Sequence, residues 1–236
     1  AGISSITESC AKALGVRLLG ANDIKVKGFT GISNSIRMGT LDSLHIGTGL
    51  ILNPVFLVFN DSAFTFANGA YKINGIIGFP IAKEMGSITL YKDSMSFEHW
   101  DDADPKNLFI ELLHPILMLK FNREELPYNF DTGAKESILS KSFYEKYKSN
   151  ELLKGLEISN SKVSSAGGER SFRTITIPSL DMNLSNLPIT IENLQVDLDN
   201  YQSGDKELYG NIGQDLLKQY SKVIISFENN YLKLER

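Results

Sequence analysis

An internal repeat constrains the fold of this 236-residue chain more than any other feature of its sequence. Three segments recur in the same order at nearly one spacing, with residues 1–12 matching 134–145, residues 36–46 matching 172–182, and residues 74–90 matching 209–225. The last pair aligns without gaps and places Gly78 on Gly213. Because repeated segments in one order indicate repeated structure, the sequence predicts two copies of one folding unit.

The two copies predict two lobes joined by a linker. Residues 98–107 are acidic and contain a proline, which is typical of a connecting segment. We therefore expect an N-terminal lobe over residues 1–100 and a C-terminal lobe over residues 106–236. The length fits this division, because typical domains have about 100 to 150 residues.

Most of each copy has the residue pattern of β-strands, with short runs of β-branched and aromatic residues bounded by glycine, asparagine and proline. The predicted strands are residues 24–27, 36–44, 55–59 and 86–90 in the first copy, and 117–121, 128–130, 173–177, 189–196, 223–227 and 231–234 in the second. Hairpin turns are predicted at residues 122–125 and 228–230, and short helices at residues 7–14, 140–147 and 215–220. The sequence therefore predicts an all-β chain with a few short helices.

Charge and cysteine content exclude several classes of function. The formal net charge is −4 and no long run of lysine and arginine occurs, which argues against a nucleic-acid partner. No apolar stretch reaches the roughly 18 residues of a membrane span. The single cysteine, Cys10, excludes an intramolecular disulfide. It aligns with Phe143 of the second copy on a short predicted helix, so we interpret Cys10 as a small buried apolar residue. His45, His99 and His114 lack ligand spacing, so we expect neither a metal nor a cofactor.

The segment Asp131-Thr132-Gly133-Ala134 carries the clearest chemical signal. The apolar strand at residues 128–130 delivers an acidic side chain to a tight glycine turn. Such a turn also occurs for structural reasons alone, because an aspartate can cap its own backbone amides. Further along, the chain returns through apolar residues to Asn211-Ile212-Gly213, and this pairing of motifs favours a functional role.

Three ordered landmarks resemble those of the retropepsin-like aspartic proteases. They are Asp131-Thr132-Gly133-Ala134, the glycine-rich hairpin at residues 164–168, and Asn211-Ile212-Gly213, in which Asn211 departs from the usual apolar residue. Phe29-Thr30-Gly31 and Ile76-Ile77-Gly78 resemble the second and third landmarks again in the first copy. The set looks most like the duplicated, two-lobed bacterial relatives of the retroviral proteases. The resemblance implies two acid-protease-like barrels with the active cleft between the lobes.

The resemblance also implies peptide-bond hydrolysis by two aspartates that share one proton. Two carboxylates about 3 Å apart cannot both ionise, so one activates a water molecule and the other donates a proton to the substrate. By resemblance, Asp131 is one member of this dyad. Thr132 would hold the two active-site loops together through its hydroxyl, and Gly133 would let backbone amides approach the carboxylates. Ala134 matches the retroviral form of the motif.

Two glycine-containing segments are candidate flaps over the substrate, because the family folds a hairpin over its substrate at these positions. The flap residues are Phe29, Thr30 and Gly31 in the first copy, and Ala166, Gly167 and Gly168 in the second. The expected substrate is an extended peptide or protein segment whose backbone pairs with strands of the flap and cleft. Ordinary hairpin turns are the alternative explanation for both segments.

The counterpart of Asp131 in the first copy falls outside the sequence. Ala134 matches Ala1, so the second aspartate is expected three residues before Ala1. The strands at residues 117–130 lack a counterpart as well, which should leave a sheet edge and apolar surface uncovered in the first lobe. Either an N-terminal segment has been trimmed, or another chain or an associated cleaved piece supplies these strands.

The sequence thus predicts an aspartic-type endopeptidase that is active as the full-length protein and inactive as residues 1–236 alone. A non-catalytic peptide-binding or structural protein on the same scaffold is the alternative, and the residue three positions before Ala1 distinguishes them. A homodimer that brings two copies of Asp131 together is a second alternative, although a monomer with two pseudo-symmetric lobes is favoured. The scarcity of cysteine is compatible with an exported or periplasmic protein.

Overall fold

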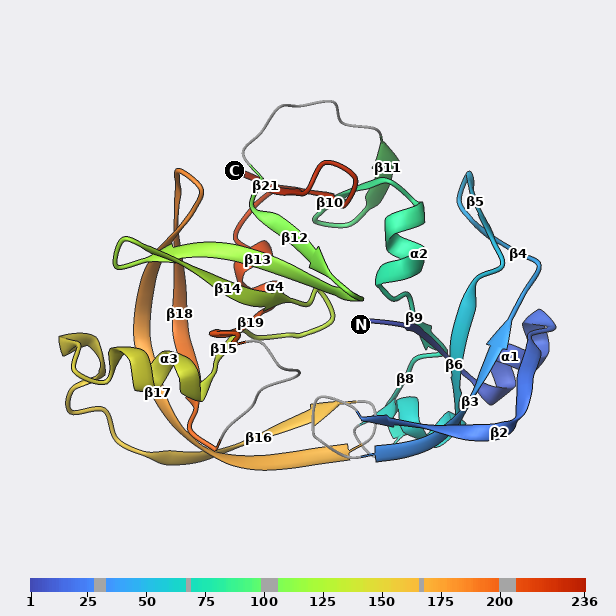
Figure 1. Cartoon of the computed structure of the whole chain (residues 1–236), viewed down its shortest axis with the longest axis horizontal. Coiled ribbons are helices and arrows are strands. Elements are labelled where there is room, and N and C mark those ends of the chain that lie inside the picture. Colours follow the sequence, from blue (N-terminus) through green and yellow to red (C-terminus); the bar gives the residue numbers. More distant parts are fainter. Residues whose placement is uncertain (28–32, 67–68, 99–105, 166–167, 200–206) are drawn as a thin grey trace. The chain divides into compact units, whose positions relative to one another are not determined.

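The computed structural model describes residues 1–27, 33–66, 69–98, 106–165, 168–199 and 207–236 (Figure 1). The described residues form mainly strands, the longest of 17 residues, and four α-helices of at most seven residues, so the predicted all-β class is confirmed. The chain divides into two compact units. The first comprises Ala1–Met85 with Lys162–Arg170, and the second comprises Gly86–Ser161 with Ser171–Arg236.

An open five-stranded sheet forms the centre of the first unit. Its order is β2-β3-β6-β1-β9, in which β1 runs parallel to β6 and the other neighbours are antiparallel. The strands are β1 (Ser4–Thr7), β2 (Arg17–Lys27), β3 (Ser33–Thr40), β6 (Val55–Phe59) and β9 (Gly75–Ile76). Two small hairpins join β4 (Ser43–Ile46) to β5 (Gly49–Leu52), and β7 (Thr65–Phe66) to β8 (Tyr71–Lys72). The single strand predicted over residues 36–44 is therefore two strands, because the chain leaves the sheet after Thr40 to form the β4–β5 hairpin.

Short helices cover the apolar side chains of this sheet. Helix α1 (Glu8–Leu14) begins after Thr7, whose side-chain oxygen accepts a hydrogen bond from the Cys10 amide, and ends at Gly15 with φ of 75°. Helix α2 (Phe79–Glu84) carries a proline in its first turn, and η1 (Asp61–Phe64) is a single 3₁₀ turn. One core cluster contains Ile6, Ala11, Ile51, Phe56, Val58 and Ile81, with Cys10 packed against it and partly buried.

A closed barrel forms the centre of the second unit, and the residues of its β16 and β17 that fall within Lys162–Arg170 belong to the first unit. Its sheet has the order β12-β13-β14-β19-β15-β18-β17-β16, and a further pairing of β13 with β17 at Lys120 and Asn183 closes it. The strands are β12 (Leu108–Glu111), β13 (His114–Phe121), β14 (Glu124–Phe130), β15 (Ile138–Leu139), β16 (Ser159–Ser165), β17 (Gly168–Leu184), β18 (Leu187–Asp197) and β19 (Gly210–Ile212). The predicted turn between β13 and β14 is confirmed by the positive φ angles of Asn122 and Arg123.

Helices and buried side chains complete the barrel. Helix α3 (Lys141–Tyr147) follows Ser140, as predicted, and the ring of Phe143 lies 4.9 Å from that of Tyr147. Two shorter elements than α3 follow along the chain, the 3₁₀ turn η3 (Glu151–Leu153) and helix α4 (Gln214–Leu217). The barrel interior is apolar, and its fully buried side chains include Leu117, Leu119, Leu139, Ile177 and Leu180.

A second sheet in this unit joins segments from both sequence copies. Its order is β11-β10-β20-β21, formed by β10 (Ser87–Tyr91), β11 (Met95–Glu98), β20 (Lys222–Ser226) and β21 (Tyr231–Glu235). Ser87 lies opposite Ser226 in the register, and their buried hydroxyls are 2.9 Å apart. Strand β10 therefore belongs to the second compact unit, which begins at Gly86, and the predicted lobes over residues 1–100 and 106–236 stay a prediction.

Asn107 ties the start of β12 to β21. Its side-chain nitrogen, Nδ2, donates to the Leu232 carbonyl at 3.0 Å and to the Ser185 hydroxyl at 3.2 Å. Its side-chain oxygen, Oδ1, accepts from the Leu232 backbone amide at 2.7 Å. Asn107 is 6% exposed.

We expect Asn107→Ala to lower the free energy of unfolding by about 3 kcal/mol, because it leaves buried backbone groups without partners. Urea unfolding measures this, with Ser185→Ala as the control that removes one bond and costs about 1 kcal/mol. Equal losses of unfolding free energy in the two variants would contradict the role of Asn107 in joining the start of β12 to β21.

The strand pairings of the two sequence copies correspond. In the first unit, β1 runs parallel to β6 and antiparallel to β9. In the second unit, β15 runs parallel to β18 and antiparallel to β19. Helices α1 and α3 follow β1 and β15, and helices α2 and α4 follow β9 and β19. Both units therefore contain one and the same arrangement of three strands and two helices.

Individual hydrogen bonds correspond as well. The Gly78 amide donates to the Ser4 hydroxyl at 2.8 Å, and the Gly213 amide donates to the Ser137 hydroxyl at 2.9 Å. One residue later, the amide at position 79 donates to the Ala1 carbonyl at 2.8 Å, as the amide at position 214 donates to the Ala134 carbonyl at 2.9 Å. These contacts pair the residues that the sequence repeat aligns.

Candidate active site

Asp131 lies at the point where two parallel strands end. Strand β14 runs parallel to β19, with Asn129 opposite Asn211 and Phe130 opposite Ile212. The pairing continues one residue further, because the Asp131 amide donates to the Ile212 carbonyl at 3.0 Å. The side chains of Phe130 and Ile212 are buried, so the barrel core fixes the backbone that carries the acid.

The turn after Asp131 is held by the aspartate itself. The Gly133 amide donates to Asp131 Oδ1 at 2.9 Å, and the Ala134 amide donates to the Asp131 carbonyl at 3.0 Å. Asp131 is half-buried, whereas Thr132 and Gly133 are exposed. The carboxylate therefore caps its own turn, as the structural explanation of the motif requires, and it also remains accessible to solvent.

A second layer of contacts fixes this turn from the side of helix α4. The side-chain amide of Gln214 donates to the Thr132 carbonyl at 2.7 Å. The Ser137 hydroxyl lies 2.6 Å from Asp215 Oδ1, and the Ser137 amide donates to Asp215 Oδ2 at 2.8 Å. Because Ser137 also accepts from the Gly213 amide, these contacts connect the loop after Asp131 to the helix after Gly213.

Sequence reasoning missed the positioning residues Ser137, Gln214 and Asp215. The repeat contains a signal for Ser137, because Ser4 occupies the matching position and makes the matching hydrogen bond. No such signal exists for Asp215, since Pro80 occupies its place in the first copy. The predicted role of the Thr132 hydroxyl stays a prediction, and the contact seen for Thr132 involves its carbonyl.

Asn211, which departs from the apolar pattern, has a partner in the neighbouring strand. It is 3% exposed, and its side-chain oxygen accepts a hydrogen bond from the Asn129 side chain. A buried side-chain amide is tolerated when it is hydrogen-bonded. Asn129 supplies this hydrogen bond, so Asn211 can replace the usual apolar residue.

The predicted flap residues lie mostly outside the described part of the chain. Phe29, Thr30, Gly31, Ala166 and Gly167 fall in the segments that are not described, and Gly168 is the first residue of β17. Their role in substrate binding stays a prediction. Of the predicted site residues, the structure describes Asp131, Thr132 and Gly133 within one turn.

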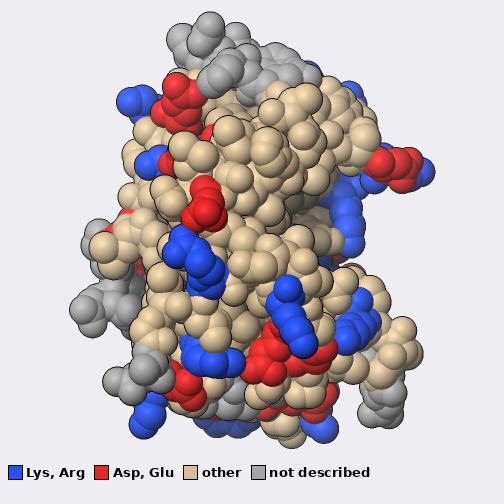
Figure 2. Space-filling view, turned by 90° about the vertical axis from the view of Figure 1, so that its right-hand side faces the viewer, with Lys and Arg blue, Asp and Glu red and all other residues tan. Residues whose placement is uncertain are grey.

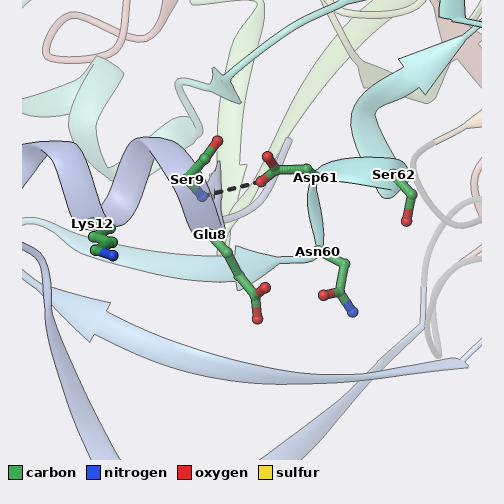
Figure 3. Close-up of a pocket in the computed structure, with 6 residues that line it drawn as sticks. All are labelled: Glu8, Ser9, Lys12, Asn60, Asp61 and Ser62. Carbon is green, nitrogen blue, oxygen red and sulfur yellow. Dashed lines mark hydrogen bonds between the residues drawn. The ribbon is translucent and has the colours of Figure 1, made fainter.

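A shallow polar pocket lies elsewhere, between helix α1 and η1 of the first unit (Figure 3). The Ser9 amide donates to Asp61 Oδ1 at 3.0 Å, and Lys72 lies 3.3 Å from Asp61 Oδ2. The hydrogen bonds from Ser9, with Lys72 nearby, hold the pKa of the Asp61 carboxyl below its usual range. The acidic group is thus already satisfied by protein donors, and the pocket contains none of the predicted site residues.

The charged and titratable side chains of the described residues indicate no second candidate functional site. On the face shown in Figure 2, basic and acidic side chains lie interspersed rather than in a patch of one sign. No group of three or more His, Cys, Asp or Glu side chains among the described residues could hold a metal ion. None of the described helices is long and apolar enough to cross a membrane.

Comparison with solved structures finds retropepsin-like domains. The crystal structure of the retroviral protease-like domain of Ddi1 from Leishmania major aligns at 21% identity and a TM-score of 0.33, over 50% of this chain and 83% of that one. A retropepsin-like aspartic protease from Rickettsia conorii aligns at 21% identity and a TM-score of 0.31, over 48% of this chain and 89% of that one. Part of the chain is thus similar to retropepsin-like domains. No family model and no curated protein matches the sequence.

Proposed function

We propose that this protein is a retropepsin-like aspartic-type endopeptidase in which Asp131 is one of two catalytic carboxylates. The observation that carries the proposal is the turn at Asp131. The acid is partly exposed, yet its backbone is fixed by the Ile212 carbonyl and its loop by Ser137, Gln214 and Asp215. Fixed geometry with access to solvent is what a carboxylate needs in order to hold and activate a water molecule.

The second carboxylate belongs, in this proposal, to the matching turn of the first copy. The matched strand pairings and the matched hydrogen bonds of Ser4 and Ser137 support a duplicated unit. The Ala1 carbonyl accepts from the backbone as the Ala134 carbonyl does, so the position that corresponds to Asp131 lies three residues before Ala1. The two lobes would each supply one acid, and the protein would work as a monomer.

The proposed chemistry follows from the sharing of one proton between two close carboxylates. The ionised acid removes a proton from a water molecule, which attacks the carbonyl carbon of the scissile peptide. The protonated acid donates to the carbonyl oxygen, and a proton then passes to the leaving nitrogen as the carbon–nitrogen bond breaks. The water oxygen ends in the new carboxyl group, one proton passes from the dyad to the amine, and the dyad recovers the proton that it gave to the carbonyl oxygen, so that it again holds one proton.

A cleavage assay with a fluorogenic peptide library tests this proposal. Two proteins are compared from pH 3 to 7, the polypeptide with its native sequence upstream of Ala1 and residues 1–236 alone. We expect cleavage by the longer protein only, with activity confined to the pH range in which the dyad holds one proton. No cleavage by the longer protein at any pH would instead support the non-catalytic peptide-binding alternative. Cleavage by residues 1–236 that rises with the square of protein concentration would support a homodimer.

A further inference from the structure

The sheet face that carries Asp131 also carries two hydrogen-bonded asparagines. Successive side chains of a strand point to opposite faces of its sheet, and Tyr128 and Phe130 of β14 are buried in the barrel core. Asn129 therefore points to the opposite face, as does Asp131, two residues further along. Asn211 lies opposite Asn129 on β19 and accepts its hydrogen bond. The asparagine pair, Asn129 and Asn211, thus stands about 7 Å along the strand from the candidate catalytic acid.

The same face continues across the neighbouring strands as a row of side chains without charge. Strands β14, β19, β15 and β18 are neighbours in that order (Figure 1). Ile138 of β15 lies opposite Asn211, and Gln195 of β18 lies opposite Ile138. Residues that lie opposite each other in a sheet share a face, so this face of the second unit carries three side-chain amides as well as Asp131.

The first unit contains the matching row with apolar residues in place of the amides. Strand β1 lies between β9 and β6, as β15 lies between β19 and β18. The register places Ile76 where the second unit has Asn211, and Leu57 where it has Gln195. The same three-strand arrangement therefore forms without amides at these positions. Because the fold does not require them, the amides of the second unit need a separate explanation.

The asparagine pair retains hydrogen-bonding groups that its internal bond does not use. Asn211 is 3% exposed, and among the described residues its side-chain nitrogen has no protein acceptor. The side-chain oxygen of Asn129 likewise has no donor in the described part of the chain. Buried polar groups without a protein partner are generally satisfied by water or by a ligand. Asn129 is half-buried, so the pair offers one donor and one acceptor at a place that solvent reaches.

We propose that the asparagine pair is a subsite for a carboxamide side chain, that of glutamine or asparagine, in an extended peptide substrate. A carboxamide carries an oxygen acceptor and a nitrogen donor, which complement the Asn211 nitrogen and the Asn129 oxygen. A carboxylate or an ammonium group complements only one of the two, and an aliphatic side chain complements neither. The inference rests on the proposed function for its peptide ligand, but not on cleavage of that peptide.

Peptide binding tests the inference in the polypeptide that includes the native upstream sequence and carries Asp131→Asn, which should bind peptides without consuming them. Fluorescent peptide pools are used in which each position in turn is fixed as glutamine, leucine or glutamate, and anisotropy gives the affinity. We expect one position at which glutamine binds about tenfold more tightly than leucine, the effect of one or two hydrogen bonds. Glutamate at that position should bind no more tightly than leucine.

Replacing both asparagines together locates the contact. Asn129→Leu combined with Asn211→Ile removes both amides at once and gives position 211 the residue type of Ile76, its counterpart in the first unit. Because neither amide is left without its partner, we expect the urea midpoint to stay close to that of the unmodified protein while the preference for glutamine disappears. Asn183→Leu, at an exposed asparagine of β17, is the matched control and should keep the preference.

Each outcome separates the subsite from the proposed peptidase. The inference is overturned if no position prefers glutamine, if the preference survives in the double variant, or if Asn183→Leu abolishes it equally. A protein that cleaves peptides without any preference for glutamine would keep the peptidase and refute the subsite. A protein that binds glutamine peptides through the asparagine pair, yet cleaves none of them without the Asp131→Asn substitution, would refute the peptidase and leave the subsite standing.

Discussion

Replacing Asp131 by asparagine is expected to lower kcat/KM for peptide cleavage by about a thousandfold or more in the polypeptide that includes the native upstream sequence. Asparagine has the same shape, and its oxygen can still accept the hydrogen bond that the Gly133 amide donates to Asp131 Oδ1. It cannot take a proton from water, so the turn should persist while the chemistry stops. Initial rates on a cleaved library peptide measure the effect, and circular dichroism verifies the fold.

Asp181→Asn is the matched control for this substitution. Asp181 lies in β17 of the same unit, and its carboxylate accepts from the Thr190 hydroxyl at 2.6 Å on the exposed face. The charge change is identical, but the residue is far in sequence from the Asp131 turn. We expect cleavage within about twofold of the unmodified protein. An Asp131→Asn protein that remains as active as the Asp181→Asn protein would rule out Asp131 as a catalytic acid.

Gly213→Ala is expected to lower the free energy of unfolding by about 3 kcal/mol or more. A Cβ atom at position 213 would lie 2.7 Å from the Ala134 carbonyl oxygen and 3.0 Å from the Glu136 carbonyl carbon and oxygen. These are backbone atoms of the loop that follows Asp131, so they cannot move aside without disturbing the hydrogen bond from the position 214 amide to the Ala134 carbonyl. Urea unfolding followed by circular dichroism measures the loss.

Gly155→Ala separates this steric effect from ordinary backbone strain. Gly155 has a φ of 73°, but a Cβ atom there meets nothing within 4 Å. The expected cost is therefore about 1 kcal/mol, which reflects the left-handed backbone alone. If Gly213→Ala is no more destabilising than Gly155→Ala, then the close approach between residue 213 and the loop after Asp131 is not rigid.

The repeat and the strand periodicity predicted the elements that depend on local sequence. The helix after Thr7 follows from its capping residue and the turn at Asn122 from its turn residues, and the structure contains both. The predicted helix after Ser140 is present as well, although the Ser140 side chain makes no capping hydrogen bond. Helix α2 was missed, because Pro80 reads as a break although proline is accepted in the first turn of a helix.

The parts that sequence could not predict depend on long-range pairing. Asp215 looks like one of several acids near a helix start, and its importance appears only when Ser137 is placed against it. Asn211 looks like a defect in an apolar motif until Asn129 is seen on the adjacent strand. Single residues carry no record of their partners in space, and the sequence repeat helps only where both copies have kept the same contact.

The pairing of β10 with β20 has a consequence for the folding of the chain during its synthesis. Ser87 leaves the ribosome long before its partner Ser226. At about 5 to 20 residues per second, the edge of β10 waits for roughly 7 to 30 seconds before β20 arrives. The β10–β11 hairpin pairs residues that are close in sequence, so we expect it to form before β20 is synthesised and to leave β10 with one open edge during that interval. This ribbon is where we expect chaperones to bind, and where slower translation would promote aggregation.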